Sequence, residues 1–271
     1  MIIVLILHYL SLLFLIILII LSCIILSNQN NSQQKEELSL MNQQEGYSRI
    51  FPIELQQKTG NQREKAFTTI YQQKLWGKEH PNGFGSLNEF TKNDKMSLLY
   101  LIKKYNIQNI FDVPCGTYSW MHEVIDTTGI QYTGMDIVKE QVDTNRKKYP
   151  QHSFLHGDMT VSKFQSFDLI FSKEGTQHMT ETSTLSFLER VQESKSKYLC
   201  LTHYDVSFNT DDTYDTINGI PDLESGAYRE QNFLLPPYSL SAKMKLLDMF
   251  YIRNNIATKN SQYLLFFQVM N

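Results

Sequence analysis

The segment at residues 107–121, IQNIFDVPCGTYSWM, constrains the fold of this chain more than any other. It begins as a short apolar run that ends at Asp112, breaks at Pro114 and turns at a single glycine, Gly116. Residues that can open a helix follow. A strand, a tight turn and a helix in this order are typical of the first unit of a doubly wound α/β domain.

The same alternation continues along the chain. Apolar runs predict strands at residues 107–113, 131–137, 152–156, 167–172 and 197–203. Helical spacing of apolar residues predicts helices near 118–127, 139–149 and 182–194, and two upstream at 63–75 and 94–105. Strands that alternate with helices imply a parallel sheet with helices on both faces.

The C-terminal part departs from this alternation. A helix is predicted at 241–248, and two further strands are predicted at 249–257 and 262–269 with a polar turn between them. Two strands joined by a short connection pair in antiparallel fashion. The predicted fold is therefore a Rossmann-like, doubly wound α/β sheet of seven strands, mostly parallel, with a C-terminal antiparallel hairpin strand.

Charge and cysteine usage exclude several classes of function. The net charge is −3 and the basic residues are scattered, so the sequence predicts no nucleic-acid partner. The three cysteines, Cys23, Cys115 and Cys200, have neither metal-ligand spacing nor the density of a disulfide framework. We therefore predict no metal site, and nothing in the sequence indicates an obligate protein partner.

The first 26 residues are strongly apolar. Residues 2–26 contain no charged side chain, and as a helix they would span about 37 Å, enough to cross a hydrocarbon core of about 30 Å. A cleaved signal peptide is the alternative, but a basic n-region and a small-x-small cleavage site are both missing. We predict a single-pass transmembrane anchor at 1–26, a disordered polar linker at 27–62 and a folded domain at 63–271. Lys35 and Arg49 follow the span, which favours a cytosolic domain.

Acidic residues stand at the ends of three predicted strands. Asp112 ends the first strand, Asp136 ends the second, and Asp158 follows the third. Ligands of doubly wound sheets bind beyond the carboxyl ends of the strands, so these side chains should share one site. Asp136 lies 20 residues after Gly116, the spacing of a carboxylate that accepts hydrogen bonds from ribose hydroxyls.

The turn lacks the features of a phosphate site. It contains one glycine instead of G-x-G-x-x-G, and the chain has no G-x-x-x-x-G-K-[ST] motif. Three converging carboxylates would also repel a phosphate. They would suit a ligand with an adenosine ribose, a sulfonium and an ammonium group, a description that S-adenosylmethionine fits.

The strand ends as a series resemble a known family. FDVPCG, YTGMDI, HGDM and FDLIFSKEGTQHM resemble motifs I to IV of class I S-adenosylmethionine-dependent methyltransferases. DVPCGTYSWM, together with the later NFLLPPYSL, resembles a subgroup with a D-x-P-C-G-D-x-x-W-M turn. The resemblance covers about residues 67–269. It implies that Asp112 and Gly116 line the methionine part of the cofactor, that Asp136 holds the ribose, and that Asp158 and Met159 meet the adenine.

The resulting cofactor-binding set comprises Asp112, Pro114, Cys115, Gly116, Asp136, Ile137, Asp158, Met159 and Lys173. Two positions depart from the subgroup pattern. Thr117 stands where an acid is expected, and the fourth strand ends in Lys173-Glu174 instead of Arg-Asp. We still expect the chain to bind the cofactor, and these two departures are the reason to consider a chain that binds it without turnover.

The predicted function is transfer of a methyl group to an oxygen or nitrogen of a small-molecule or lipid-like acceptor. His178 is the candidate base, because it follows the fourth strand and an imidazole titrates near neutrality. Glu174 is a second candidate. The loop at 204–230 could serve as a substrate lid. The alternatives are a membrane-tethered pseudoenzyme that binds the cofactor without turnover and, as a weaker one, a nicotinamide-dependent oxidoreductase.

Overall fold

The computed structural model describes residues 53–77, 80–209, 228–254 and 260–270. The chain divides into two compact units, Met1–Leu55 and Gln56–Asn271, and the sheet lies in the second. The predicted anchor at 1–26 lies outside the described residues, as does most of the predicted lid (210–227). None of the helices in the described ranges is long and apolar enough to cross a membrane.

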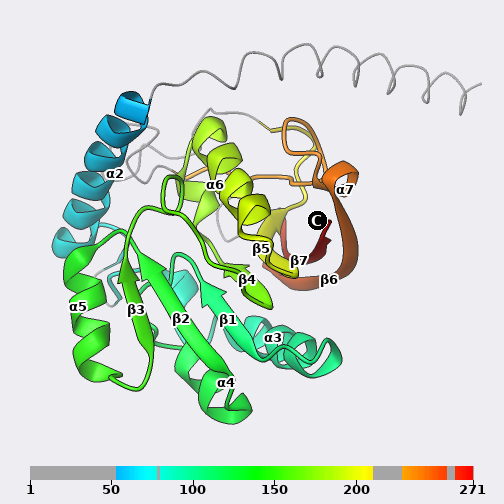
Figure 1. The fold of residues 1–271 in the computed structure, drawn as a ribbon, viewed down its shortest axis with the longest axis horizontal. Coiled ribbons are helices and arrows are strands. Elements are labelled where there is room, and N and C mark those ends of the chain that lie inside the picture. Colours follow the sequence, from blue (N-terminus) through cyan, green and yellow to red (C-terminus); the bar gives the residue numbers. More distant parts are fainter. Residues whose placement is uncertain (1–52, 78–79, 210–227, 255–259, 271) are drawn as a thin grey trace, which may run out of the picture. The chain divides into compact units, whose positions relative to one another are not determined.

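A seven-stranded sheet forms the centre of the domain, as the sequence predicted (Figure 1). Its order is β3-β2-β1-β4-β5-β7-β6. Five strands run parallel: β1 (Asn109–Asp112), β2 (Gln131–Asp136), β3 (Ser153–His156), β4 (Leu169–Ser172) and β5 (Tyr198–Tyr204). The strands β6 (Met244–Asn254) and β7 (Ser261–Val269) form the antiparallel hairpin, and β7 pairs antiparallel with β5. From β1 the chain adds strands first toward one edge of the sheet (β2, β3) and then toward the other (β4, β5), so the strand order reverses between β1 and β4. Ligands of such sheets bind at this reversal point.

Helices cover both faces of the sheet (Figure 1). On one face, α3 (Lys92–Lys104), α4 (Met121–Thr128) and α5 (Lys139–Lys148) bury residues such as Leu101 and Val124 against the strands. On the other face, α6 (Glu181–Ser194) buries Phe187 and Val191. Both apolar stripes follow the helical spacing seen in the sequence, which is why the layers could be predicted.

The remaining helical elements surround the ends of the strands. They are α2 (Ile53–Gln73), α7 (Leu240–Lys243) and two short 3-10 turns, η1 (Phe84–Ser86) and η2 (Thr176–His178). Helix α2 corresponds to the helix predicted at 63–75 but begins earlier, at Ile53.

One predicted element is wrong over part of its length. The helix predicted at 241–248 ends at Lys243, and Met244 begins β6. Met244 pairs with Val269 and the ladder continues to Asn254, with two irregularities along it. Pairing along the whole of β7 therefore outweighs the local helical pattern, an example of tertiary context overriding propensity.

Candidate functional site

A pocket opens at the carboxyl ends of β1, β2 and β4, at the reversal point of the sheet. The structure brings every sequence-predicted site residue to its wall: Asp112, Pro114, Cys115, Gly116, Asp136, Ile137, Asp158, Met159, Lys173, Glu174 and His178. Residues that the sequence analysis did not select also line it, among them Arg63, Phe67, Tyr71, Trp76 and Asn82. These last residues come from α2 and from the loop that follows it.

Two buried carboxylates stand at the centre of the pocket. Tyr132 donates its hydroxyl hydrogen to Asp112 Oδ2 over 2.8 Å. The backbone N–H groups of Gly116 and Val138 donate to Oδ2 and Oδ1 of Asp136 over 3.0 and 2.9 Å. Across the described chain, no Lys, Arg or His side chain forms an ion pair with either carboxylate.

Burial governs the protonation of both groups. It raises the pKa of Asp112 to about 7, with the charge of Asp136 contributing in the same direction. Burial also raises the pKa of Asp136, although the N–H groups of Val138 and Gly116 partly offset this effect. A cation placed between the two carboxylates would relieve both penalties.

The turn after β1 is held by the loop at residues 76–86. Gly116 has a φ of 55°, a left-handed conformation that a residue without a β-carbon adopts easily. Asn82 Oδ1 accepts a hydrogen bond from Thr117 N over 3.2 Å, and Asn82 Nδ2 donates to Gln141 Oε1 over 3.0 Å. Asn82 thereby connects the turn after β1 to α5.

His80 of the same loop contacts the side chains of the turn. Its Nδ1 accepts from Asn82 N, so the neutral ring carries its proton on Nε2. Nε2 lies 3.2 Å from Thr117 Oγ1 and 3.1 Å from Ser119 Oγ. Burial lowers the pKa of His80, which favours this neutral form. The hydroxyl at position 117, where the subgroup pattern has an acid, is therefore engaged by a neutral histidine.

Asp158 is paired with a cation, unlike the two central carboxylates. Arg63 Nη1 lies 2.5 Å from Asp158 Oδ2, and both side chains are buried. Thr160 donates to Asp158 Oδ1 from its backbone N and from its hydroxyl, each over 2.9 Å. The third predicted acid thus carries little uncompensated charge.

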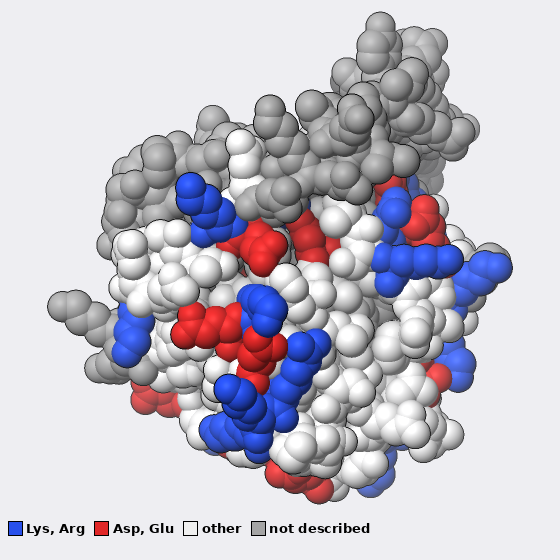
Figure 2. All heavy atoms as spheres, turned by 60° about the vertical axis from the view of Figure 1, so that its left-hand side comes forward, with Lys and Arg blue, Asp and Glu red and all other residues white. Residues whose placement is uncertain are grey.

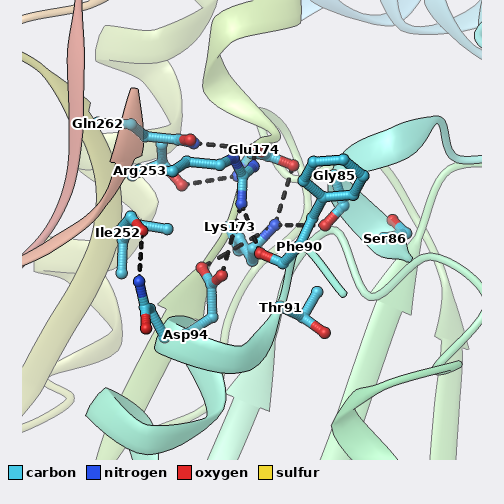
Figure 3. A network of polar contacts seen from close by, with 12 residues as sticks. Gly85, Ser86, Phe90, Thr91, Asp94, Lys173, Glu174, Ile252, Arg253 and Gln262 are labelled. Atoms are coloured by element: carbon cyan, nitrogen blue, oxygen red, sulfur yellow. Dashed lines mark hydrogen bonds and ion pairs between the residues drawn. The ribbon is translucent and has the colours of Figure 1, made fainter. Parts of the chain in front are cut away.

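Lys173 and Glu174 belong to a buried network of charged groups (Figure 3). Lys173 Nζ donates to Gly85 O and to Glu174 Oε2, each over 2.9 Å. Arg253 pairs with Glu174 Oε1, and Gln262 Nε2 donates to the same oxygen over 2.8 Å. Burial alone would raise the pKa of Glu174, but the charges of Lys173 and Arg253 outweigh it and lower that pKa to about 2. Such an acidic carboxyl group is a poor general base, which argues against the catalytic role considered for Glu174.

Asp94 of α3 completes the network. Its carboxylate lies 4.0 Å from Lys173 Nζ and 3.6 Å from Arg253 Nη1, and it is almost fully buried. A β-carbon at Gly85 would overlap Glu174 Oε2, so only glycine permits this approach of η1 to the network. The two acids and two cations fix η1 against the end of β4.

His178 also lines the pocket, in η2. Its ring stacks on Trp76 with centroids 4.4 Å apart, and Tyr228 meets it edge-on at 5.9 Å. Trp76 also contacts Phe67 of α2. The candidate base is thus set in an aromatic wall that the sequence analysis did not anticipate, because its members are far apart in the chain.

The outer surface beside the site carries charges of both signs. On the face drawn in Figure 2, blue and red side chains adjoin one another. Asp143 of α5 pairs with both Lys139 and Arg146. Asp143 therefore compensates part of the positive charge of α5.

Comparisons with known proteins agree with this geometry. Residues 110–194 match the family model described as a methyltransferase domain. No curated protein matches the sequence. Among solved structures, the methyltransferase domain of bacterial CtHen1-C superposes with a TM-score of 0.51 at 10% identity, over 67% of this chain and 100% of that one. Magnesium protoporphyrin IX methyltransferase from Synechocystis PCC 6803 with bound SAH gives 0.50 at 13%, over 69% and 90%.

At these identities the structures establish the fold, and the match to the family model is confined to residues 110–194. The segment runs from β1 to the end of α6 and contains most of the pocket wall. The chain therefore has the fold of class I methyltransferases, and the predicted resemblance to class I S-adenosylmethionine-dependent methyltransferases is confirmed.

Proposed function

We propose that the pocket binds S-adenosylmethionine and that the domain transfers its methyl group to an oxygen or nitrogen of a small-molecule acceptor. One observation carries the proposal: Asp112 and Asp136 are both buried in the pocket at the carboxyl ends of β1 and β2, and neither forms an ion pair within the described chain. A ligand that brings a sulfonium and an ammonium group would be stabilised there, whereas one that brings a pyrophosphate would be repelled.

Each acid has a role that its contacts support. Gly116 and Val138 occupy one position on each oxygen of Asp136, and an ionised carboxylate offers about four acceptor positions. Asp136 would hold the ribose, as the resemblance implies. Asp112 would face the ammonium group, and Asp158 with Met159 would meet the adenine.

The cofactor supplies an activated methyl group, and the chain supplies alignment. Holding a donor and an acceptor in line can lower a barrier by about 7–11 kcal/mol. His178 would remove a proton from the acceptor, because its imidazole lines the same pocket. Lys173, Glu174 and Asp94 would keep the wall formed by η1 in place instead of taking part in proton transfer.

A nicotinamide-dependent oxidoreductase is less consistent with the site. Such enzymes bind a pyrophosphate at a glycine-rich turn. Here Asp112 and Asp136 flank a turn with one glycine, and Asn82 lies within 3.5 Å of where a β-carbon of Gly116 would be. We therefore retain only the pseudoenzyme as a serious alternative.

A ligand screen followed by a transfer assay tests the proposal. A ligand at 100 times its Kd adds about 2.7 kcal/mol of stability, roughly 5–10 °C in Tm for a domain of this size. We expect this shift with S-adenosylmethionine and its demethylated product, no shift with NADH, and loss of the shift in Asp136→Ala. Stabilisation by NADH alone would contradict the proposal.

Transfer of a labelled methyl group to fractionated metabolites then separates enzyme from pseudoenzyme. We expect labelled product with the unaltered chain and a loss of rate in His178→Ala at unchanged cofactor affinity. Binding without any labelled product would favour the pseudoenzyme.

A further inference from the structure

Arg63 of α2 lies outside the segment that matches the methyltransferase family and yet reaches the wall of the pocket. Its Nη1 contacts Asp158 Oδ2 at 2.5 Å and Thr160 Oγ1 at 2.8 Å, and its Nη2 donates to Ser183 Oγ over 3.1 Å. Only 4% of Arg63 and 9% of Asp158 is exposed. The guanidinium is therefore held between the end of β3 and the start of α6.

Counting acceptor positions on Asp158 shows what this arrangement leaves for a ligand. Arg63 occupies one position on Oδ2, and the two bonds from Thr160 fill Oδ1. An ionised carboxylate has about four acceptor positions, so one remains, on Oδ2. Asp158 lines the pocket, and this position can accept a hydrogen bond but cannot donate one.

The charge balance also differs between the two ends of the pocket. Asp112 and Asp136 have no paired cation in the described chain, whereas Asp158 is compensated by Arg63. A compensated carboxylate favours a neutral N–H donor over a cation. Without the guanidinium, the Asp158 carboxylate would lose the side chain that fixes Oδ2 and would no longer present an acceptor in a fixed place.

We propose that Arg63 is a positioning residue that keeps Asp158 an acceptor and so makes the pocket selective for a base with an exocyclic amino group. The inference rests on the proposed function, since it takes the ligand to be an adenosine derivative. It extends the cofactor site to α2, upstream of the matched segment. A base with a carbonyl in place of the amino group would place its carbonyl oxygen opposite Asp158 Oδ2, and both atoms are acceptors.

The experiment compares S-adenosylhomocysteine with its deaminated form S-inosylhomocysteine, in which a carbonyl replaces the amino group and N1 gains a hydrogen, by calorimetric titration. We expect the unaltered chain to favour the amino form by about tenfold or more, since a polar site rejects an analogue that leaves its groups unpaired. Arg63→Gln should reduce this preference to near unity, and Arg63→Lys, which keeps the charge, should restore most of it. Lys65→Gln, an exposed position on the same helix, should leave the preference unchanged.

A ratio of two affinities measured on one protein sample does not depend on the fraction that is folded, so loss of stability in Arg63→Gln cannot imitate the effect. Asp158→Asn gives a second route, because its amide can donate to a carbonyl and should also abolish the preference. An unchanged preference in Arg63→Gln or in Asp158→Asn would overturn the inference. Failure of the unaltered chain to bind S-adenosylhomocysteine would instead overturn the proposed function.

Discussion

At the scale of single residues, Asp112 shows that stability and binding make opposite demands. Its side chain is buried at the wall of the pocket and accepts one hydrogen bond, from Tyr132. Burial raises its pKa from 3.8 to about 7, so the folded chain binds this proton more tightly than the unfolded chain does. Its protonated form therefore contributes stability that is present at low pH and is lost as the pH rises from about 4 to about 7.

The substitution Asp112→Asn should consequently stabilise the apo domain at pH 8. A shift from 3.8 to about 7 corresponds to an upper limit on the order of 4 kcal/mol. We expect the difference in free energy of unfolding to be largest at pH 8 and to vanish near pH 4, as measured by urea denaturation. The same variant should bind S-adenosylmethionine more weakly at pH 8. A variant that is less stable than the unaltered chain at both pH values would refute this account of Asp112.

Residue-scale reasoning from the sequence found the acids but not their partners. Asp112, Asp136 and Asp158 were predictable, because strand ends in a parallel sheet converge and the strands were visible as apolar runs. Arg63 was not, because it pairs with a residue 95 positions away and lies on a helix with no motif of its own. The pKa of Glu174 depends on Arg253 of β6, and no local pattern indicates that contact.

At the scale of elements, the loop at 76–86 acts as the outer support of the turn after β1. Trp76, Asn82 and Ser86 of this loop line the pocket. The Asn82 side chain accepts a hydrogen bond from the backbone N–H of Thr117 and donates one to the side chain of Gln141. Removing this side chain would leave the turn attached to α5 by fewer contacts.

We expect Asn82→Ala to weaken cofactor binding by about five- to tenfold, since one or two hydrogen bonds of about 1 kcal/mol each are lost. Asn88→Ala, at an exposed position that does not line the pocket, should have no such effect. Calorimetric titration with S-adenosylhomocysteine measures both. Equal affinities in the two variants would show that the loop does not order the turn.

The elements that the sequence predicted well are those with strong apolar periodicity. The strands β2, β3 and β5 and the helices α5 and α6 lie within a few residues of their predicted bounds. The stretch at 244–248 was misassigned, because its apolar residues fit a helical spacing as well as an edge strand, and only β7 decides between them.

At the scale of the whole molecule, the described domain has a methyltransferase fold, and its N-terminal helix α2 lines the pocket. The match to the family begins at residue 110, but the pocket is completed by α2 and the loop at 76–86. The functional unit therefore starts well before the first motif. The transmembrane anchor predicted at 1–26 remains a prediction from the apolar run alone and would place this unit beside a bilayer.

The central claim is that the buried acids Asp112 and Asp136, which form no ion pair within the described chain, make this pocket a site for S-adenosylmethionine. Its most direct test is calorimetric titration of S-adenosylmethionine into the chain and into two variants, Asp136→Asn and Asp143→Asn, the latter replacing a partly exposed acid of α5. We predict one site per chain, an affinity at least about tenfold weaker in Asp136→Asn and an unchanged affinity in Asp143→Asn. No binding to the unaltered chain, or equal affinity in all three proteins, would contradict the claim.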